Sequence, residues 1–142
     1  MFKAEWSFGK EAFGPIAALR ATLGIAGDAM DDYAAHVYVF DEDGSAIAAG
    51  RMYPALDAIR IDKLATAPER RALPYAEFTL RVILYKAKDL PQTVIEIVPT
   101  EDIAPLLPLF GFSKAENGLM SCPREGLVWF SQCKHEAEAK KS

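Results

Sequence analysis

The sequence has few cysteines and histidines, and it has no excess of positive charge. Of its 142 residues, two are cysteine and two are histidine. Cys122 and Cys133 are too few for a disulfide framework and match no metal-ligand spacing, so we expect a reducing compartment and no bound metal. The 16 Lys and Arg residues against 20 Asp and Glu give a net charge of −4. Because nucleic acids and anionic membranes both attract basic surfaces, we expect neither as a partner.

The sequence also lacks a long hydrophobic run. The least polar stretch, Ile103–Phe112, is about half the length of a membrane-spanning helix and contains prolines. Near the N-terminus, Glu5 stands where a signal peptide would need apolar residues. We therefore expect a cytoplasmic protein without a transmembrane helix.

What the sequence does contain is typical of a globular protein. Hydrophobic residues make up 51% of the chain and charged residues 25%, close to the averages for folded domains. The length corresponds to one domain, which we place at residues 1–134. Residues 135–142 form a charged tail that we expect to be disordered.

The first half of the chain predicts a β-meander preceded by a strand and a helix. The Asp-Gly step at Asp43 and Gly44 favours a tight hairpin turn, because glycine readily adopts positive φ. Apolar and polar residues alternate on both sides of this turn and again over 58–66. The predicted elements are a strand at 1–7, a helix from about 15 to 23, and strands at 35–40, 45–53 and 58–66.

The second half predicts a helical crossover and a short antiparallel end. Pro74 suits the first turn of a helix over 74–90, and Pro91 follows that helix. The β-branched run at 93–98 is typical of a buried parallel strand. The remaining predictions are a short helix within 101–110 that ends at Gly111, strands at 112–116 and 126–133, and an irregular loop at 118–123.

This order of elements resembles the GCN5-related N-acetyltransferase (GNAT) superfamily. The resemblance is clearest from Ile61 to Phe112. Pro68, Arg71 and Ala76 match the superfamily's Pro-x-x-Arg step and the end of its phosphate-binding loop, and Gly111-Phe112 matches its Gly-Phe element. The resemblance implies an α/β (α+β) fold: a mixed, mostly antiparallel central sheet, flanked by helices, with one splayed parallel strand pair.

The resemblance also implies acetyl-CoA or another acyl-CoA as cosubstrate. Its pyrophosphate would contact the backbone of 71–76 at a helix N-terminus, where unpaired amides favour anions. The pantetheine arm would lie beside 64–66. Ala72 and Pro74 stand where the superfamily has glycines, which weakens this loop. The implied cofactor-binding residues are Leu64, Ala65, Thr66, Arg71, Ala72, Leu73, Tyr75 and Ala76.

Direct acyl transfer needs a base for the amine and an acid for the departing thiolate. The superfamily's acid is a tyrosine, but Leu107 occupies that position here. Tyr75 is our candidate for the missing acid, and Tyr53 and Tyr85 are alternative candidates. The alternative for each of these tyrosines is a packed aromatic side chain without a catalytic role. Glu96, inside an apolar strand, is the candidate base; its alternative is a structural or exposed carboxylate.

Other polar residues near these elements have two readings. His36 is either a proton shuttle or a structural histidine. Asp31, Asp32 and Asp62 are interpreted as solvated residues, with attraction of a cationic amine as the alternative.

Two functions follow from this reading. The first is an acyl-CoA-dependent N-acyltransferase acting on a small-molecule or peptide amine. The second is a catalytically inactive GNAT-fold module that binds a ligand or a partner. The sequence leaves a homodimer open.

Overall fold

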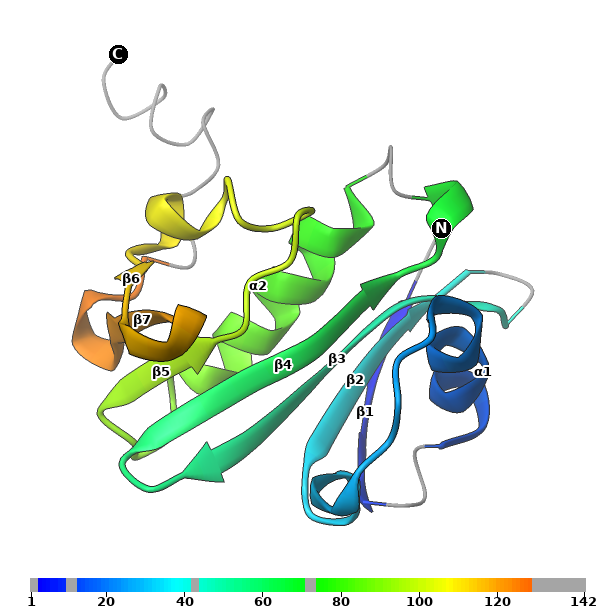
Figure 1. The fold of residues 1–142 in the computed structure, drawn as a ribbon, viewed down its shortest axis with the longest axis horizontal. Coiled ribbons are helices and arrows are strands. Elements are labelled where there is room, and N and C mark those ends of the chain that lie inside the picture. Colours follow the sequence, from blue (N-terminus) through cyan, green and yellow to red (C-terminus); the bar gives the residue numbers. More distant parts are fainter. Residues whose placement is uncertain (1–2, 10–12, 42–43, 71–73, 129–142) are drawn as a thin grey trace.

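The computed structural model describes residues 3–9, 13–41, 44–70 and 74–128. Within them, a seven-stranded sheet lies between two α-helices (Figure 1). The elements are β1 (Lys3–Phe8), α1 (Phe13–Leu23), η2 (Ala29–Asp32), β2 (Ala35–Phe40), β3 (Ala46–Ala55), β4 (Ala58–Thr66), η3 (Pro68–Arg70), α2 (Tyr75–Ala87), β5 (Val94–Ile97), η4 (Leu107–Phe110), β6 (Ser113–Lys114), η5 (Glu116–Gly118), β7 (Met120–Pro123) and η6 (Arg124–Gly126), where η marks a 3₁₀ helix.

The sheet is mixed, with the strand order β1-β2-β3-β4-β5-β7-β6. Only β4 and β5 are parallel, with Ile61 beside Ile97, and all other described neighbours are antiparallel. Parallel neighbours need a long crossover, which α2 supplies. The expected mixed sheet with one parallel pair is confirmed.

The larger core lies between the sheet and α2. Fully buried Leu80, Ile83 and Leu84 of α2 belong to one cluster with Ile61 and Ile97 of the parallel strands. This apolar stripe along α2 repeats every three to four residues, which matches the helical period. The main core is therefore built around the parallel strand pair.

A smaller cluster covers the opposite face of the sheet. Ile16 and Leu19 of α1 pack against Ala49 and Ala65, which are small residues on β3 and β4. Elsewhere this face is polar, as described below.

The predicted hairpin between β2 and β3 is confirmed. Gly44 has a φ of 85°, and its amide donates to the Asp41 carbonyl over 3.0 Å. Similarly, Gly111 ends η4 with a φ of 101°. Both glycines stand where a residue with a side chain would be strained.

Two predictions near the C-terminal end are wrong. The segment 118–123, expected to be an irregular loop, contains β7, which pairs antiparallel with β5. Residues 126–128 of the strand expected at 126–133 do not form a strand, and the rest of that range, like the predicted tail at 135–142, lies outside the described residues. β7 has no β-branched residue and ends in proline, so its strand conformation comes from pairing with β5 rather than from propensity.

Among the described residues, no helix has both the length and the hydropathy that a membrane span requires.

Candidate functional site

The two parallel strands separate part of the way along β4. Pairing with β5 ends at Ile61, where the Val98 amide donates to the Ile61 carbonyl over 2.9 Å. β4 itself continues to Thr66. Among the described residues, no strand pairs with this last part of β4 on the β5 side. This opening is the expected splay, and it lies at the carboxyl ends of the strands, where ligands of open α/β sheets bind.

A β-bulge in β4 accounts for the separation. Between the pairs Ala49–Ala65 and Arg51–Asp62, β3 contributes one residue while β4 contributes two. One of these two, Lys63, has a φ of 48°. A bulge bends its strand and increases its twist, so β4 turns away from the direction of β5.

Gly50, opposite the bulge, allows α2 to approach the sheet closely. A Cβ atom at this position would lie 2.6 Å from Ile83 Cδ1 and 2.8 Å from Leu64 Cδ2. Any side chain there would require the side chains of Ile83 and Leu64 to shift. The geometry of the opening therefore depends on this glycine.

Small and hydroxyl side chains line a hollow beside the splay. The hollow measures about 10 Å³, which is room for roughly one water molecule. Its lining comes from β3, β4, the start of α2 and the segment after β5: Ala49, Leu64, Ala65, Thr66, Ala76, Thr79, Thr100, Asp102 and Ile103. Of the predicted cofactor-binding residues, the structure thus brings Leu64, Ala65, Thr66 and Ala76 together.

The N-terminus of α2 adjoins this hollow. Pro74 is its N-cap, and the Phe78 amide donates to the Pro74 carbonyl over 3.0 Å. The first amides of a helix have no partner within it and, with the helix dipole, attract anions. Arg71, Ala72 and Leu73, predicted to hold a pyrophosphate here, lie outside the described residues.

The two predicted catalytic residues lie apart from the hollow's lining. Tyr75 is buried in a cluster with Val39, Ile47 and Ala48. Glu96 neighbours Arg60 on β4, and both Nε and Nη2 of Arg60 donate to Glu96 Oε1, over 3.0 and 2.8 Å. The Glu96 side chain is 24% exposed, so one side of this carboxylate reaches solvent.

Leu107, which the sequence resemblance aligns with the superfamily's tyrosine, is completely buried in the main core. It lies there with Phe110 and Phe112. A tyrosine at this position would overpack the core, at a cost of about 1–3 kcal/mol. Leu107→Tyr would therefore strain the packing of the main core.

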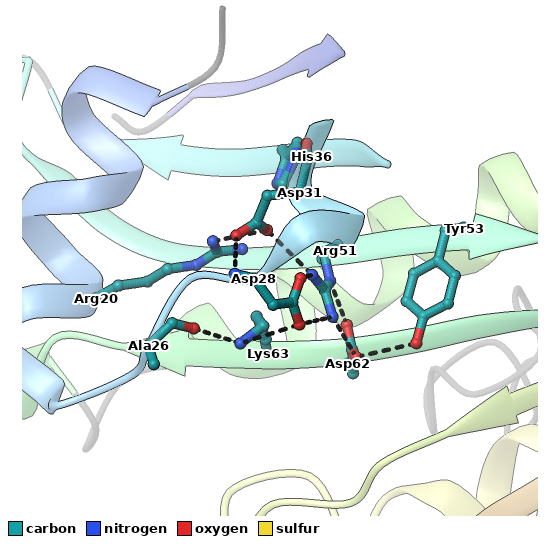
Figure 2. A network of polar contacts seen from close by, with 9 residues as sticks. All are labelled: Arg20, Ala26, Asp28, Asp31, His36, Arg51, Tyr53, Asp62 and Lys63. Atoms are coloured by element: carbon teal, nitrogen blue, oxygen red, sulfur yellow. Dashed lines mark hydrogen bonds and ion pairs between the residues drawn. The ribbon is translucent and has the colours of Figure 1, made fainter. Parts of the chain in front are cut away.

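The structure shows a polar feature that the sequence reading missed. Arg51, which is 2% exposed, contacts the carboxylates of Asp28, Asp31 and Asp62 (Figure 2). We call Arg51, these three aspartates and Arg20 the Arg51 network. The Arg51 Nε and Nη2 atoms each lie 2.8 Å from one oxygen of Asp62, which is a bidentate pair. Arg20 Nη1 donates to Asp31 Oδ1 over 3.0 Å.

The interpretation of Asp31 and Asp62 as solvated residues is therefore wrong. Asp31 is 3% exposed, and the Asp62 side chain 14%. Asp32, by contrast, is exposed as expected. A sequence signal was present, because an arginine inside the apolar strand 46–55 needs a carboxylate partner if it is buried. Which carboxylate would reach it depended on how the chain folds.

Burial and pairing set the protonation states in this region. Burial favours neutral arginine, but hydrogen bonds to Asp62 and Asp28 raise the pKa of Arg51 above its ordinary value. Burial acts against the Asp31 charge too, yet the Asp28 amide and Arg20 hold the pKa of Asp31 below its ordinary value. Arg51 and Asp31 therefore stay charged at neutral pH.

His36 has a structural place beside the network. Its ring is fully buried, and its Nε2 atom lies 2.9 Å from the Asp31 carbonyl oxygen. Burial, with lesser effects from Arg20 and Arg51, lowers the pKa of His36. A neutral ring that donates to this carbonyl fits the contact, and a ring without solvent contact favours the structural reading over the proton shuttle.

The network ties the segment after α1 to the splay. Asp28 and Asp31 precede β2, whereas Arg51 and Asp62 flank the bulge on β3 and β4. Lys63 at the bulge contacts the Ala26 carbonyl and Asp28 (Figure 2). The carboxylates are thus used to hold the bulge in place.

The fold closely matches solved acetyltransferase structures, although no family model and no curated protein matches the sequence. A proposed N-acetyltransferase from Lactobacillus plantarum superposes with a TM-score of 0.71 at 17% identity, over 86% of this chain and 97% of that one. Escherichia coli ElaA gives 0.69 at 14% identity, over 86% and 99%. The ribosomal-protein-S18-alanine N-acetyltransferase from Escherichia coli gives 0.61 at 12% identity, over 87% and 94%. Together with the bulged β4 and the splayed parallel pair, these matches show that the chain has the fold of the GNAT superfamily.

Proposed function

We propose that this protein binds an acyl-CoA in the splay between β4 and β5 and transfers the acyl group to an amine. The observation that carries the proposal is the splay itself, where, among the described residues, the last part of β4 has no strand partner on its β5 side, beside the N-terminus of α2. Free main-chain groups of a strand can bond an extended ligand, and the helix N-terminus can bind its phosphates. Acetyl as the acyl group, and the cytoplasm as the location, remain predictions.

The reaction would be a direct transfer. The neutral amine attacks the thioester carbonyl carbon, an amide bond forms, the carbon–sulfur bond breaks, and CoA leaves as a thiolate. The amine's proton goes to a base, for which we propose Glu96, and the thiolate takes a proton from Tyr75 or from water. Free thiols have a pKa of about 8.5, so solvent protonation is chemically feasible.

The present hollow is too small for the ligand's arm. A volume of about 10 Å³ holds roughly a water molecule, not a pantetheine chain. Binding therefore requires the segment that follows β5, with Thr100 and Ile103, to move away from β4. This requirement lowers the expected affinity, because part of the binding energy is spent on opening.

Calorimetric titration with acetyl-CoA tests the binding step. Ala76→Phe would fill the hollow and weaken binding at least about tenfold, equal to about 1.4 kcal/mol. Ala21→Phe, at an exposed position of α1, is the matched control and should bind as the unmodified protein does. Equal affinities for the two variants would show that any binding occurs elsewhere.

Thiol release from acetyl-CoA with a panel of amines tests the chemistry. Glu96→Gln should lower the rate by about 10²–10⁴-fold if this carboxylate is the base. Glu125→Gln, at an exposed position in η6, is its control. Tyr75→Phe keeps the packed ring and removes only the hydroxyl, so an unchanged rate would leave water as the proton donor.

Two observations favour the second candidate function, a GNAT-fold binding module without catalysis. Leu107 has no proton to donate, and the hollow beside β4 is nearly closed. A module of this kind would bind acetyl-CoA or CoA and release no thiol with any amine of the panel.

A further inference from the structure

A row of polar side chains crosses the sheet on the face opposite α2. It contains one residue from each of five neighbouring strands, and each residue is the register partner of the next: Tyr53, Arg60, Glu96, Ser121 and Ser113. The residues that alternate with them along the strands, such as Ile61 and Ile97, point into the main core on the α2 face. We call these five residues the polar row. Each of them is partly or fully exposed, so the row is accessible to a ligand.

The polar row lies at the start of the splay. Arg60 and Glu96 form the pair before Ile61 and Ile97, which is the last pair between β4 and β5. Because side chains alternate between the two faces, Arg60 and Glu96 are the last paired residues on this face before the strands separate. A molecule bound on the row therefore lies next to the splay.

The ion pair between Arg60 and Glu96 uses only part of each charged group. Both Nε and Nη2 of Arg60 donate to the same carboxylate oxygen, Glu96 Oε1. Among the described residues, no group donates to the other oxygen, Oε2. Because the guanidinium group is a planar fork, its third nitrogen, Nη1, points away from Glu96 and towards Tyr53, the other neighbour of Arg60 in the row. The side chains of Arg60 and Glu96 are 30% and 24% exposed, so solvent reaches both groups.

This pair of charges is complementary to a zwitterion. The pair has no net charge, so it gives no strong attraction to a ligand with a single charge. A ligand with both signs of charge can place its ammonium group at Glu96 Oε2 and its carboxylate at Arg60 Nη1, with a charge-assisted hydrogen bond at each end. Neighbouring strands lie about 4.8 Å apart. An α-amino acid, whose two charged groups share one carbon atom, spans this distance.

An exposed apolar residue lies beside the row on the side of the splay. Val98 follows Glu96 by two positions, so it continues the same face of the chain, and it is 40% exposed. An amino acid held by Arg60 and Glu96 would have its side chain within reach of Val98. The surface therefore favours an apolar side chain over a charged one.

We propose that the polar row binds a free α-amino acid with an apolar side chain, held by its ammonium group at Glu96 and by its carboxylate at Arg60. As the acceptor of an acyl group, this ligand rests on the proposed function, but its binding does not. In the transfer, the bound ammonium group first loses a proton to water. The neutral amine then attacks the thioester, and Glu96 takes the second proton as described above.

Titration of the ¹⁵N-labelled protein with L-leucine, followed by NMR chemical shifts, tests the binding. The titration is made with and without CoA, so that an acceptor site that forms only beside CoA is also detected. We expect the backbone amides around Arg60 and Glu96 to shift. L-Leucinamide lacks the carboxylate and N-acetyl-L-leucine lacks the ammonium group. Each should bind about tenfold more weakly than L-leucine, because each loses one charge-assisted contact.

Variants of Arg60 distinguish a contact with the ligand from a structural role. Arg60→Met should weaken the binding of L-leucine at least about tenfold and should not weaken that of L-leucinamide, which needs only Glu96. Arg60→Lys keeps the positive charge and should restore part of the affinity for L-leucine. Arg81→Met is the matched control, because Arg81 is a partly exposed arginine that pairs with Glu77 on α2. A purely structural role of Arg60 would weaken the binding of both ligands equally.

The outcomes separate this proposal from the proposed acyl transfer. The proposal is overturned if no amide near Arg60 and Glu96 shifts, with or without CoA, or if L-leucine and L-leucinamide bind equally well. Binding of L-leucine on the row without any thiol release from acetyl-CoA would support the amino-acid site and count against acyl transfer. Thiol release that is equally fast with L-leucine and L-leucinamide would support acyl transfer and overturn the amino-acid site.

Discussion

The two faces of the sheet are buried by different means. On the α2 face, fully buried residues such as Leu84 and Ile97 pack without any polar partner. On the opposite face, beside the small α1 cluster, lies the charged Arg51 network, in which Arg51, Arg20 and Asp31 are buried, Asp62 is partly buried and Asp28 is exposed. The stability of the apolar face depends on side chains that fill its volume. The stability of the charged face depends on every charged group keeping its ion-pair partner. The second arrangement is less stabilising in general, but it fixes positions more strictly, and it lies at the bulge that opens the splay.

The largest loss of stability is expected from a substitution in the Arg51 network. Arg51→Met keeps the side-chain volume but leaves three carboxylates without their shared cation. Removing one partner of a buried ion pair costs about 3–5 kcal/mol, which urea denaturation measures. Arg60→Met is the matched control, because the Arg60–Glu96 pair is partly exposed and should cost less than about 1 kcal/mol. Equal losses for the two variants would contradict this view of the network.

A comparable loss of stability is expected from a substitution on the apolar face, but this loss should not depend on charge. Leu84→Ala removes a fully buried side chain and should cost about 2–5 kcal/mol, depending on how far the cavity closes. Leu109→Ala, at a position that is 53% exposed, should stay within about 0.5 kcal/mol. Added salt should change the loss from Leu84→Ala little. A small loss at Leu84 would mean that α2 is not firmly packed on the sheet.

An intermediate loss of stability is expected at Gly50, opposite the bulge in β4. Gly50→Ala places a Cβ against Ile83 and Leu64 and should cost about 1–3 kcal/mol of stability. Because the clash is with the bulge, the variant should also change acetyl-CoA binding, if the proposed site is correct. Gly24→Ala is not a fair control, since Gly24 has a φ of 70°; Gly14→Ala has both open space and no positive φ. Equal thermal midpoints for Gly50→Ala and Gly14→Ala would show that α2 can move outward freely.

The smallest effect is a dependence of stability on mild acid. The pKa of His36 is lowered in the folded protein, so between its folded pKa and 6.5 the unfolded chain binds the extra proton. This contribution to stability is present above pH 6.5 and is lost as pH falls through the folded pKa. The pKa values of Asp28 and Asp31 are also lowered, and their contribution is lost only below about 3.8.

His36→Gln should therefore flatten the decline in unfolding free energy between pH 7 and pH 5, while leaving the decline at lower pH. Denaturation curves across this range measure both parts. An unchanged slope between pH 7 and pH 5 would show that His36 does not titrate there.

The local elements were largely predictable from the sequence because short-range chemistry determines them. The glycine at position 44 predicts a hairpin, and Pro74 and Pro91 bracket the region of α2. The β-branched run around Ile95 predicts a buried strand. β7 was missed because its four residues have no strand propensity and are held by pairing with β5.

The structure brings only some of the predicted site residues together. Leu64, Ala65, Thr66 and Ala76 line one hollow beside the splay, and their role in binding a cofactor stays a prediction. Tyr75 is buried in an apolar cluster, and Glu96 is partly exposed and paired with Arg60, so their catalytic roles stay predictions. The Arg51 network was not foreseen, because Asp28, Asp31 and Asp62 look like ordinary turn and surface residues in a linear sequence.

The sequence by itself determined the order of strands and helices, the hairpin turn and the crossover, since these follow from periodicity and from the backbone preferences of glycine and proline. The tertiary structure alone decided which face of each strand is buried near the bulge and which carboxylates surround Arg51. It also decided that Leu107 belongs to the core. The physical reason is that ion pairs in the Arg51 network join residues 11 to 23 positions apart, for which a local pattern carries no signal.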